Sequence, residues 1–307
     1  MINVYCVSDN NTDIYKTYDT AYPGGSGPNA AVNIVRTGNK AAFCGYVGKD
    51  MLGQKTIDAL REEGVDVSNI KKSAYNNDWC FIYHDNGDRK FGKNVMPVRE
   101  NCHFNAEDIK AGQNGEYDLI YTCAEATYDD DGWAQLGKSD IPVACDFSNY
   151  SPEDPRGQVL YRSKGIVDYF YISMDGRPET SDEMAEKCLK EYGAKLVICT
   201  NGSAGSDLYN GRKKYHQDAY LVDAIDTLGA GDTYLSSFTS CYFSGLKLLK
   251  QCAAQIGWDE NNEHYQACED KLIEESLAFA AVCSAKNCMI KGGFGHGFHF
   301  EESMISE

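Results

Sequence analysis

The chain has 307 residues, 42% of them hydrophobic and 24% charged, which is enough to build one large α/β core or two small ones. Its 46 Asp and Glu residues outweigh its 29 Lys and Arg residues and give a formal net charge of −17. Such acidity argues against a nucleic acid or an anionic membrane surface as a partner, because both carry negative charge themselves.

The first seven residues form a short apolar run without a basic leader, so we interpret them as a first strand and not as a signal peptide. Further along, short apolar runs alternate with helical stretches, which predicts a largely parallel, buried sheet with helices on both faces. The predicted strands are residues 3–7, 41–47, 119–122, 143–147, 169–172 and 196–200. The predicted helices are residues 30–37, 53–63, 181–192 and 274–286, the second of them capped by Asp50. Ligands of such sheets bind beyond the carboxyl ends of the strands.

Two segments, residues 14–22 and 78–95, break this alternation because they are rich in aromatic and β-forming residues. The second contains Asn86-Gly87 between two such runs, a pair typical of tight hairpin turns. The second segment therefore predicts a β-hairpin, and the plainer alternative is an ordinary surface ribbon. The polar residues 258–266 are interpreted as a surface insertion without chemistry.

The 13 cysteines are scattered singly and form no C-x-x-C pair, which argues against a zinc ribbon or a thioredoxin-like site. Many lie in apolar runs, as Cys44, Cys199 and Cys283 do. We therefore expect free thiols in a reducing cytoplasm. No apolar run approaches the roughly 20 residues that are needed to span a bilayer.

A glycine-rich segment carries the strongest chemical signal. Asp226-Thr227-Leu228-Gly229-Ala230-Gly231-Asp232 follows residues 220–225, which we interpret as a strand, and precedes an apolar helical run. A strand, a small-residue turn and a helix together present free backbone N–H groups to an anion such as a phosphate. Asp232, in the first helical turn, then lies where its carboxylate can accept a proton from an attacking hydroxyl. The alternative is a plain turn with a capping aspartate.

With this segment, the chain resembles the ribokinase-like (PfkB) family of carbohydrate kinases. Residues 226–232 match the family's D-T-x-G-A-G-D signature, residues 24–29 its G-G-x-x-x-N sugar segment, residues 45–53 its G-x-V-G-x-D-x-x-G turn and residues 60–66 its L-x-x-x-G-V-D. Several motifs in family order are far more specific than one. The resemblance implies one domain, residues 1–307, with the ribokinase-like α/β fold: a three-layer α/β/α sandwich with a mostly parallel central sheet. It also implies a small β-sheet lid near residues 12–24 and 76–97. Because a sheet with one apolar face needs cover, we expect two copies to form a homodimer through this lid.

The resemblance implies a set of site residues as well. Asp232 would be the general base, and the backbone of Gly229, Ala230 and Gly231 would form the anion hole. The implied sugar contacts are Asp9, Asp13, Gly25 and Asn29. The implied nucleotide contacts are Thr200, Gly202 and Gly205 in a T-x-G-x-x-G loop, together with Asp226, Thr227 and Leu228.

The implied cofactors are ATP and Mg²⁺, with a monovalent cation such as K⁺ as a further option. In many members an N-x-x-E segment after a central strand helps to place Mg²⁺. Here that region reads Ser173-Met174-Asp175-Gly176, so the metal ligands are left unassigned.

Within the family, the chain is most similar to the fructoselysine 6-kinase branch, through residues 8–15, 84–92 and 146–148. This implies transfer of the γ-phosphoryl group to the 6-hydroxyl of a fructosamine, with Asp9, Asp13 or Glu125 accepting hydrogen bonds from its ammonium. Arg89 would reach a substrate carboxylate, unless it is a solvated residue of an edge hairpin. The alternatives are a kinase for fructose, fructose 6-phosphate, ribose, 2-keto-3-deoxygluconate or a nucleoside, and a sugar-binding protein without catalysis.

Overall fold

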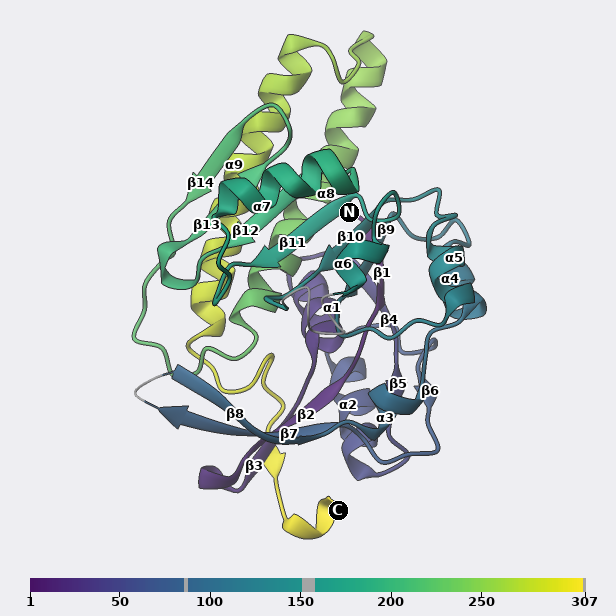
Figure 1. The fold of residues 1–307 in the computed structure, drawn as a ribbon, viewed down its shortest axis with the longest axis vertical. Coiled ribbons are helices and arrows are strands. Elements are labelled where there is room, and N and C mark those ends of the chain that lie inside the picture. Colours follow the sequence, from purple (N-terminus) through teal and green to yellow (C-terminus); the bar gives the residue numbers. More distant parts are fainter. Residues whose placement is uncertain (86–87, 151–157, 306–307) are drawn as a thin grey trace.

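A computed structural model of the chain describes residues 1–85, 88–150 and 158–305, without the side chains of residues 84, 85, 88, 89 and 158. It is built around a large twisted sheet that is covered by helices, with a smaller sheet below it in the view of Figure 1. The α/β class and the small second sheet that the sequence predicts are both confirmed.

In the described residues the larger sheet has eight strands in the order β14-β13-β12-β11-β10-β9-β1-β4. Strands β12, β11, β10, β9, β1 and β4 run parallel to one another, whereas β13 and β14 pair antiparallel at the β12 edge. The strands are β1 (Asn3–Val7), β4 (Lys40–Cys44), β9 (Leu119–Cys123), β10 (Val143–Asp146), β11 (Tyr169–Ser173), β12 (Leu196–Thr200), β13 (Ser206–Tyr209) and β14 (Lys214–Gln217). Because nearly all residues of the parallel strands are buried, their apolar runs are continuous.

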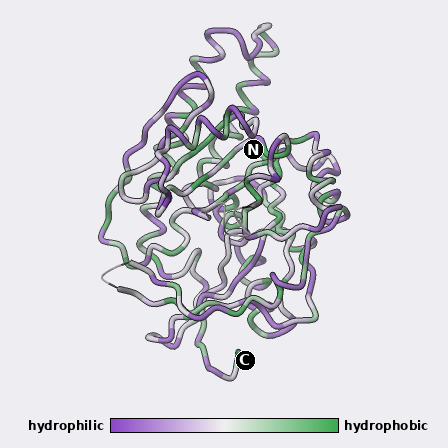
Figure 2. The backbone as a smooth tube through the Cα atoms, in the orientation of Figure 1, coloured by the Kyte–Doolittle hydropathy of each residue, from purple (hydrophilic) through white to green (hydrophobic). Residues whose placement is uncertain are grey.

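Helices cover both faces of this sheet, and each face has its own hydrophobic core. Side chains of α1, α2, α8 and α9 pack on one face, and those of α4, α5, α6 and α7 pack on the other. In Figure 2 the segments of hydrophobic residues, drawn in green, lie mostly in the interior between these layers. The helices are α1 (Ser26–Arg36), α2 (Met51–Glu62), α3 (Pro97–Asn101), α4 (Ala106–Gly112), α5 (Asp130–Leu136), α6 (Gln158–Arg162), α7 (Ser181–Lys187), α8 (Ala230–Ile256) and α9 (Glu263–Asn287).

The smaller sheet has the order β15-β3-β2-β7-β8 in the described part of the chain. Its strands are β2 (Asn11–Tyr15), β3 (Thr20–Gly24), β7 (Trp79–Asp85), β8 (Asp88–Val95) and β15 (Phe298–His299). Strands β7 and β8 pair antiparallel, as a hairpin requires, although Asn86 and Gly87 themselves lie outside the described residues. The prediction of β-structure in both segments is therefore confirmed.

Several boundaries differ from the predicted ones. The strand at residues 41–47 is broken at Gly45, because Tyr46–Val47 (β5) pairs with Lys71–Lys72 (β6) in a separate ribbon. Helix α9 begins at Glu263, where Asn262 caps it, so much of the polar stretch at 258–266 is helical. The prediction of a strand at residues 220–225 is wrong. In the described part of the chain this segment pairs with no strand, and Tyr220, Leu221, Val222 and Ile225 are all exposed.

Asp50 caps α2 as expected, with its carboxylate accepting a hydrogen bond from the N–H of Gly53 at 3.1 Å. All 13 cysteines are free thiols in the structure. Among the described residues, no helix combines the length and the apolar composition that a membrane span needs.

Candidate active site

The polar residues at the carboxyl edge of the parallel sheet come together at one site, as the topology predicts. Asp9 directly follows β1, Glu125 lies just after β9, and Asp146 ends β10. The N-terminus of α8 approaches the same place, because Asn29 of α1 donates from Nδ2 to Asp232 Oδ2 at 2.7 Å. Two motifs that are 203 residues apart in the sequence are thus in direct contact.

The start of α8 depends on Gly229, which is the N-cap residue and has a φ of 71°. A Cβ atom at this position would lie 2.7 Å from the Cα of Gly293, so close packing and left-handed backbone both require glycine. Gly231, two residues later, has open space where its Cβ would be. The first N–H groups of a helix have no acceptors within the helix, so this end of α8 is suited to bind an anion.

Two amides of the preceding turn already have acceptors inside it. Leu228 donates its N–H to Asp226 Oδ1 at 3.0 Å, and Ala230 donates its N–H to the carbonyl of Thr227 at 3.3 Å. The fully buried Asp226 carboxylate also accepts hydrogen bonds from the Tyr15 hydroxyl and from the N–H of Gly292. Asp226 therefore ties the glycine turn to the smaller sheet and to the segment that follows α9.

The predicted sugar residues lie on β2 and at the start of α1. Asp13 is buried and accepts a hydrogen bond from Asn11 Nδ2 at 2.9 Å. Burial raises the pKa of Asp13 to about 7, the Asn11 hydrogen bond opposes this shift, and the nearby carboxylates of Asp226 and Asp232 add to it. Gly25 has a φ of 96°, and a Cβ there would lie 2.8 Å from the Cα of Asn10.

Three amide oxygens in this region are buried and have no hydrogen-bond partner among the described residues. They are Oδ1 of Asn10, Asn11 and Asn29. A buried polar atom without a partner costs free energy, so such atoms in a native protein are usually explained by a ligand, a water molecule or a function. Their concentration here indicates a place where hydroxyl donors bind.

The structure adds three residues that sequence reasoning did not place in the site. Arg99, on α3, bridges Asp9 and Glu125. Burial raises the pKa of Asp146 to about 7, and the charge of Asp232 contributes to the shift. The Tyr121 hydroxyl is buried, feels the charges of Asp146 and Asp232, and has no hydrogen-bond partner among the described residues. Asp146 and Tyr121 had a detectable signal, because both lie on strands of the parallel sheet; Arg99 had none.

The loop of Thr200, Gly202 and Gly205 follows β12 at the same edge of the sheet. A Cβ on Gly205 would overlap the carbonyl oxygen of Gln217, so this glycine is needed for packing. The hydroxyl of Ser206 lies 2.5 Å from that of Tyr234, which places the loop beside α8.

An exposed apolar surface adjoins the glycine turn. Residues 220–225 contribute Tyr220, Leu221, Val222 and Ile225, and α9 contributes Phe279 and Val282, all of them 39–77% exposed. The N–H of Ile225 donates to the carbonyl of Cys288 at 2.8 Å, which holds the segment against the end of α9. The apolar pattern of residues 220–225 predicts a strand and gives no sign of this exposed surface.

The role of Arg89 stays a prediction, and the metal ligands stay without an assignment. Arg89 belongs to β8, but its side chain lies outside the described part of the chain. No cluster of three or more His, Cys, Asp or Glu residues that is suited to hold a metal ion occurs among the described residues. The metal ligands thus remain unassigned.

The comparison with protein families decides the class of this site. The model of the "pfkB family carbohydrate kinase" matches residues 1–124 and 173–292, which include the sugar segment, the turn after β12 and the glycine turn at α8. The chain belongs to the pfkB family. It is therefore a sugar kinase, which transfers a phosphoryl group to an alcohol group of a sugar.

Curated relatives extend the family match over the whole chain. The protein is 28% identical to fructosamine kinase FrlD of Bacillus subtilis over 303 residues, which is 97% of this chain and 95% of the relative. It is 30% identical to fructoselysine 6-kinase of Escherichia coli over 250 residues, which is 81% of this chain and 92% of the relative.

The fold matches that of solved sugar kinases. A fructokinase from Vibrio cholerae, crystallised with fructose, ADP and calcium ion, superposes with a TM-score of 0.72 over 96% of this chain and 95% of its own, at 20% identity. The ribokinase-like sandwich that the sequence predicts is therefore confirmed.

Proposed function

We propose that this pfkB-family kinase transfers the γ-phosphoryl group of Mg–ATP to the 6-hydroxyl of a fructosamine, such as fructoselysine, with Asp232 as the general base. The observation that carries the proposal is the contact between Asn29 and Asp232. It places a carboxylate from the glycine turn within hydrogen-bond distance of the predicted sugar segment. A base in this place can take the proton of the attacking hydroxyl.

The start of α8 fits the transferred phosphoryl group. We take the open space beside Gly231 as the phosphoryl cradle, where a methyl group would stand in the way of a bound phosphate, and the helix N-terminus provides N–H donors and a positive dipole end. Because the amides of Leu228 and Ala230 already have acceptors, we assign the anion hole chiefly to Gly229 and Gly231. Bound Mg–ATP supplies the phosphoryl group and neutralises charge on the phosphates. Asp226 and Thr227 hold the turn in shape.

The nucleotide is proposed to lie between the loop of Thr200, Gly202 and Gly205 and the exposed apolar surface of residues 220–225 and α9. Exposed apolar patches of this kind commonly mark binding grooves. The flat ring of a nucleobase suits such a surface, whereas the ribose and phosphates face the polar loop and α8. ATP and Mg²⁺ are the proposed cofactors, and a requirement for K⁺ would be found by assay.

The sugar is proposed to bind between the smaller sheet and the start of α1. The buried carboxyl of Asp13 and the oxygens of Asn11 and Asn29 provide acceptors for its hydroxyl groups. Close backbone approach at Gly25 completes this surface. The smaller sheet then acts as a lid within a single domain of residues 1–307, and we propose that two lids pack together in a homodimer.

The choice of a fructosamine rests on the two relatives of that class and on residues 8–15, 84–92 and 146–148. The main alternative is free fructose, because the V. cholerae structure with this fold holds fructose. Arg89 stays a candidate for contact with a substrate carboxylate.

The deciding experiment compares kcat/KM for fructoselysine, fructose, fructose 6-phosphate and ribose under one condition, with the phosphorylated carbon identified by NMR. We expect fructoselysine to be preferred and to be phosphorylated at carbon 6. Equal use of fructose or ribose would disprove the fructosamine assignment. Absence of ATP turnover with any sugar would contradict the assignment of Asp232 as a base.

A further inference from the structure

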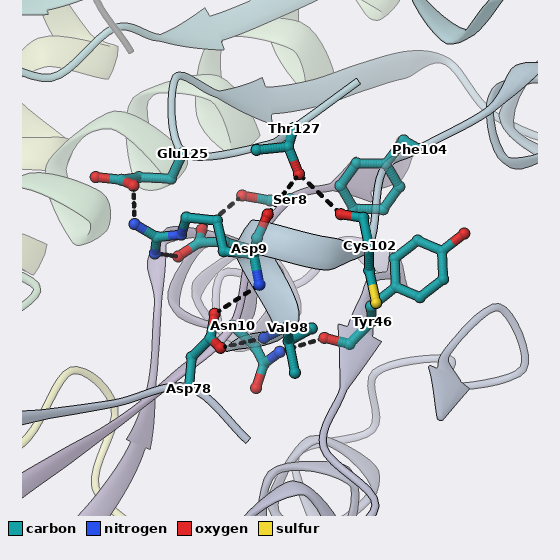
Figure 3. Close-up of a pocket in the computed structure, with 11 residues that line it drawn as sticks. Ser8, Asp9, Asn10, Tyr46, Asp78, Val98, Cys102, Phe104, Glu125 and Thr127 are labelled. Carbon is teal, nitrogen blue, oxygen red and sulfur yellow. Dashed lines mark hydrogen bonds and ion pairs between the residues drawn. The ribbon is translucent and has the colours of Figure 1, made fainter. Parts of the chain in front are cut away.

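A charged cluster beside the proposed sugar site has no role in the phosphoryl transfer described above. Arg99 NH2 lies 2.8 Å from Asp9 Oδ2, and Arg99 NH1 forms an ion pair with Glu125. In Figure 3 the side chains of Asp9 and Glu125 lie above that of Asp78. The three side chains come from α3 and from the ends of β1 and β9, so the cluster exists only in the folded chain.

The cluster is held rigidly from the backbone of α3. The carboxylate of Asp78 accepts hydrogen bonds from the N–H groups of Val98 at 2.7 Å and Arg99 at 3.1 Å. The hydroxyl of Thr127 donates to the carbonyl of Cys102 at 2.9 Å, just after α3. Both ends of α3 are thereby fixed, so the guanidinium and its two carboxylates have little freedom to rearrange.

These charges are well removed from water. The side chains of Arg99, Asp9 and Glu125 are 15%, 6% and 14% exposed. Burial by itself lowers the pKa of Arg99, but the charges of Asp9 and Glu125 outweigh it and raise the pKa above its ordinary value. The trio sums to a charge of −1 when both carboxylates are ionised. Burial of a charged group costs free energy unless an opposite charge compensates it. A buried cluster with an uncompensated charge is therefore a candidate for a functional site.

A cavity of about 20 Å³ lies beside the cluster, lined by Asp9, Asn10, Arg99 and Glu125 among others. Two of these residues carry polar atoms that are buried and have no hydrogen-bond partner among the described residues, namely Arg99 Nε and Asn10 Oδ1. The space is enough for about one water molecule or one small charged group. Asn10 Oδ1 can accept a further hydrogen bond at this cavity, whereas Arg99 Nε–H can donate one.

The cavity adjoins the proposed sugar site through the short segment of Asp9, Asn10 and Asn11. Asn10 lines the cavity on one side and packs against Gly25 on the other. Asn10 therefore borders both the cavity and the proposed sugar site, and Asp9 is its neighbour in the chain. Asp13 lies on β2, where its carboxylate accepts a hydrogen bond from Asn11 Nδ2 at 2.9 Å.

We propose that Arg99 holds Asp9 and Glu125 as a paired carboxylate receptor for the ammonium group on carbon 1 of the sugar, and that this pair sets the preference for fructosamines over fructose. The inference rests on the proposed function and deepens it. Asp9 and Glu125 accept charge-assisted hydrogen bonds from the ammonium. Arg99 acts as a positioning residue, since its planar guanidinium bridges both carboxylates in a way that lysine does not reproduce.

The test measures kcat and KM for fructoselysine, 1-amino-1-deoxyfructose and fructose in the wild type and in four variants, Glu125→Gln, Arg99→Lys, Glu100→Gln and Asp13→Asn. In Glu125→Gln, the ratio of kcat/KM for fructoselysine to that for fructose should fall by about 10-fold to 100-fold, since one charged hydrogen bond is lost. Arg99→Lys should raise KM for fructoselysine with little change in kcat. The matched control is Glu100→Gln, an exposed carboxylate on the same short helix, which should leave the ratio unchanged.

The outcomes separate the inference from the proposed function. If the wild type prefers fructoselysine but Glu125→Gln lowers turnover of both sugars equally, the receptor is disproved and the function stands. If the wild type uses fructose as well as fructoselysine, both fail. The amine 1-amino-1-deoxyfructose tests the same point without a mutation, because the receptor predicts that it keeps most of the preference over fructose. An Asp13→Asn variant that alone abolished the preference would overturn the assignment to Asp9 and Glu125.

Discussion

At the scale of single residues, the site is defined by pairs of side chains whose partners lie far apart in the sequence. Asn29 binds the proposed base, Asp232, and Tyr15 and Gly292 bind Asp226. A hydrogen bond from Asn29 holds the Asp232 carboxylate in one orientation, which is what a general base needs.

Replacement of Asp232 by Asn is therefore expected to lower kcat by about two to four orders of magnitude, because the amide cannot accept the proton. Sugar affinity should change little, since the substitution is isosteric. Steady-state kinetics and calorimetric titration of the sugar measure the two quantities. The control is Asp131→Asn, which changes an exposed aspartate in the first turn of α5 and should be silent. More than about a tenth of wild-type turnover in Asp232→Asn would exclude its role as the base.

Replacement of Gly231 by Ala is expected to separate activity from stability. The added methyl meets open space in the folded chain, and Ala favours a helix over Gly by about 1 kcal/mol, so Tm should hold or rise. Turnover should nevertheless fall by about tenfold or more, because the methyl occupies the proposed phosphoryl cradle.

The matched variant is Gly229→Ala, which should lower Tm. Its Cβ would collide with Gly293 and its φ of 71° disfavours any residue but glycine. Thermal unfolding and kcat, measured together for both variants, check the contrast. Full activity in a folded Gly231→Ala enzyme would show that no phosphate lies against this turn.

At the scale of secondary-structure elements, the smaller sheet has one face toward the site and a hairpin, β7–β8, at its edge. Tyr83 and Phe91 on this hairpin are 42% and 61% exposed. Large exposed apolar side chains on a sheet that covers a ligand are well placed to meet a second copy.

Replacement of Phe91 by Asp is accordingly expected to weaken the proposed homodimer by at least about tenfold, since a charge would have to be buried at its centre. Sedimentation velocity over a concentration series measures the dissociation constant. The control is Leu248→Asp on α8, where the wild-type side chain is also 61% exposed. A wild type that sediments as a monomer at every concentration would refute the dimer, and equal effects of both variants would place the interface elsewhere.

At the scale of the whole molecule, the feature that stands out is buried acid in a chain of net charge −17. Burial, the largest cause in each case, raises the pKa of Asp13, Asp78 and Asp146 to about 7. The unfolded chain releases these protons near pH 4, whereas the folded chain keeps them until about pH 7. Their contribution to stability is thus fully present below about pH 4 and is lost as the pH rises to about 7.

The variant Asp13→Asn should be more stable relative to wild type at pH 8 than at pH 5, by at most about 3 kcal/mol. Its amide imitates the protonated acid and removes the cost of ionisation. Urea unfolding at the two pH values, in the absence of ligands, gives the difference. The exposed Asp131→Asn variant serves again as the control. A pH-independent difference for Asp13→Asn would mean that this carboxyl is ionised across the range.

Much of the fold could be read from local sequence. Residues 3–7 and 196–200 were predicted as strands with the bounds that β1 and β12 have, because buried parallel strands are continuous apolar runs. The same reasoning wrongly predicted a strand at residues 220–225, because an apolar segment that stays exposed has the same composition as a buried strand. The glycine turn was found because its shape depends on consecutive residues.

The sequence by itself determined the sugar-kinase family, the parallel sheet and the proposed base, since each is encoded by a short motif or a periodic pattern. Only the tertiary structure brought Arg99 to Asp9 and Glu125, which are 90 and 26 residues away from it. It alone showed that Asp226 is bound by Tyr15 and Gly292. The physical reason is that the carboxyl ends of parallel strands gather at one edge of the sheet, whereas the chain between them is long. Which side chains meet there depends on strand order and helix packing, and no local pattern records either.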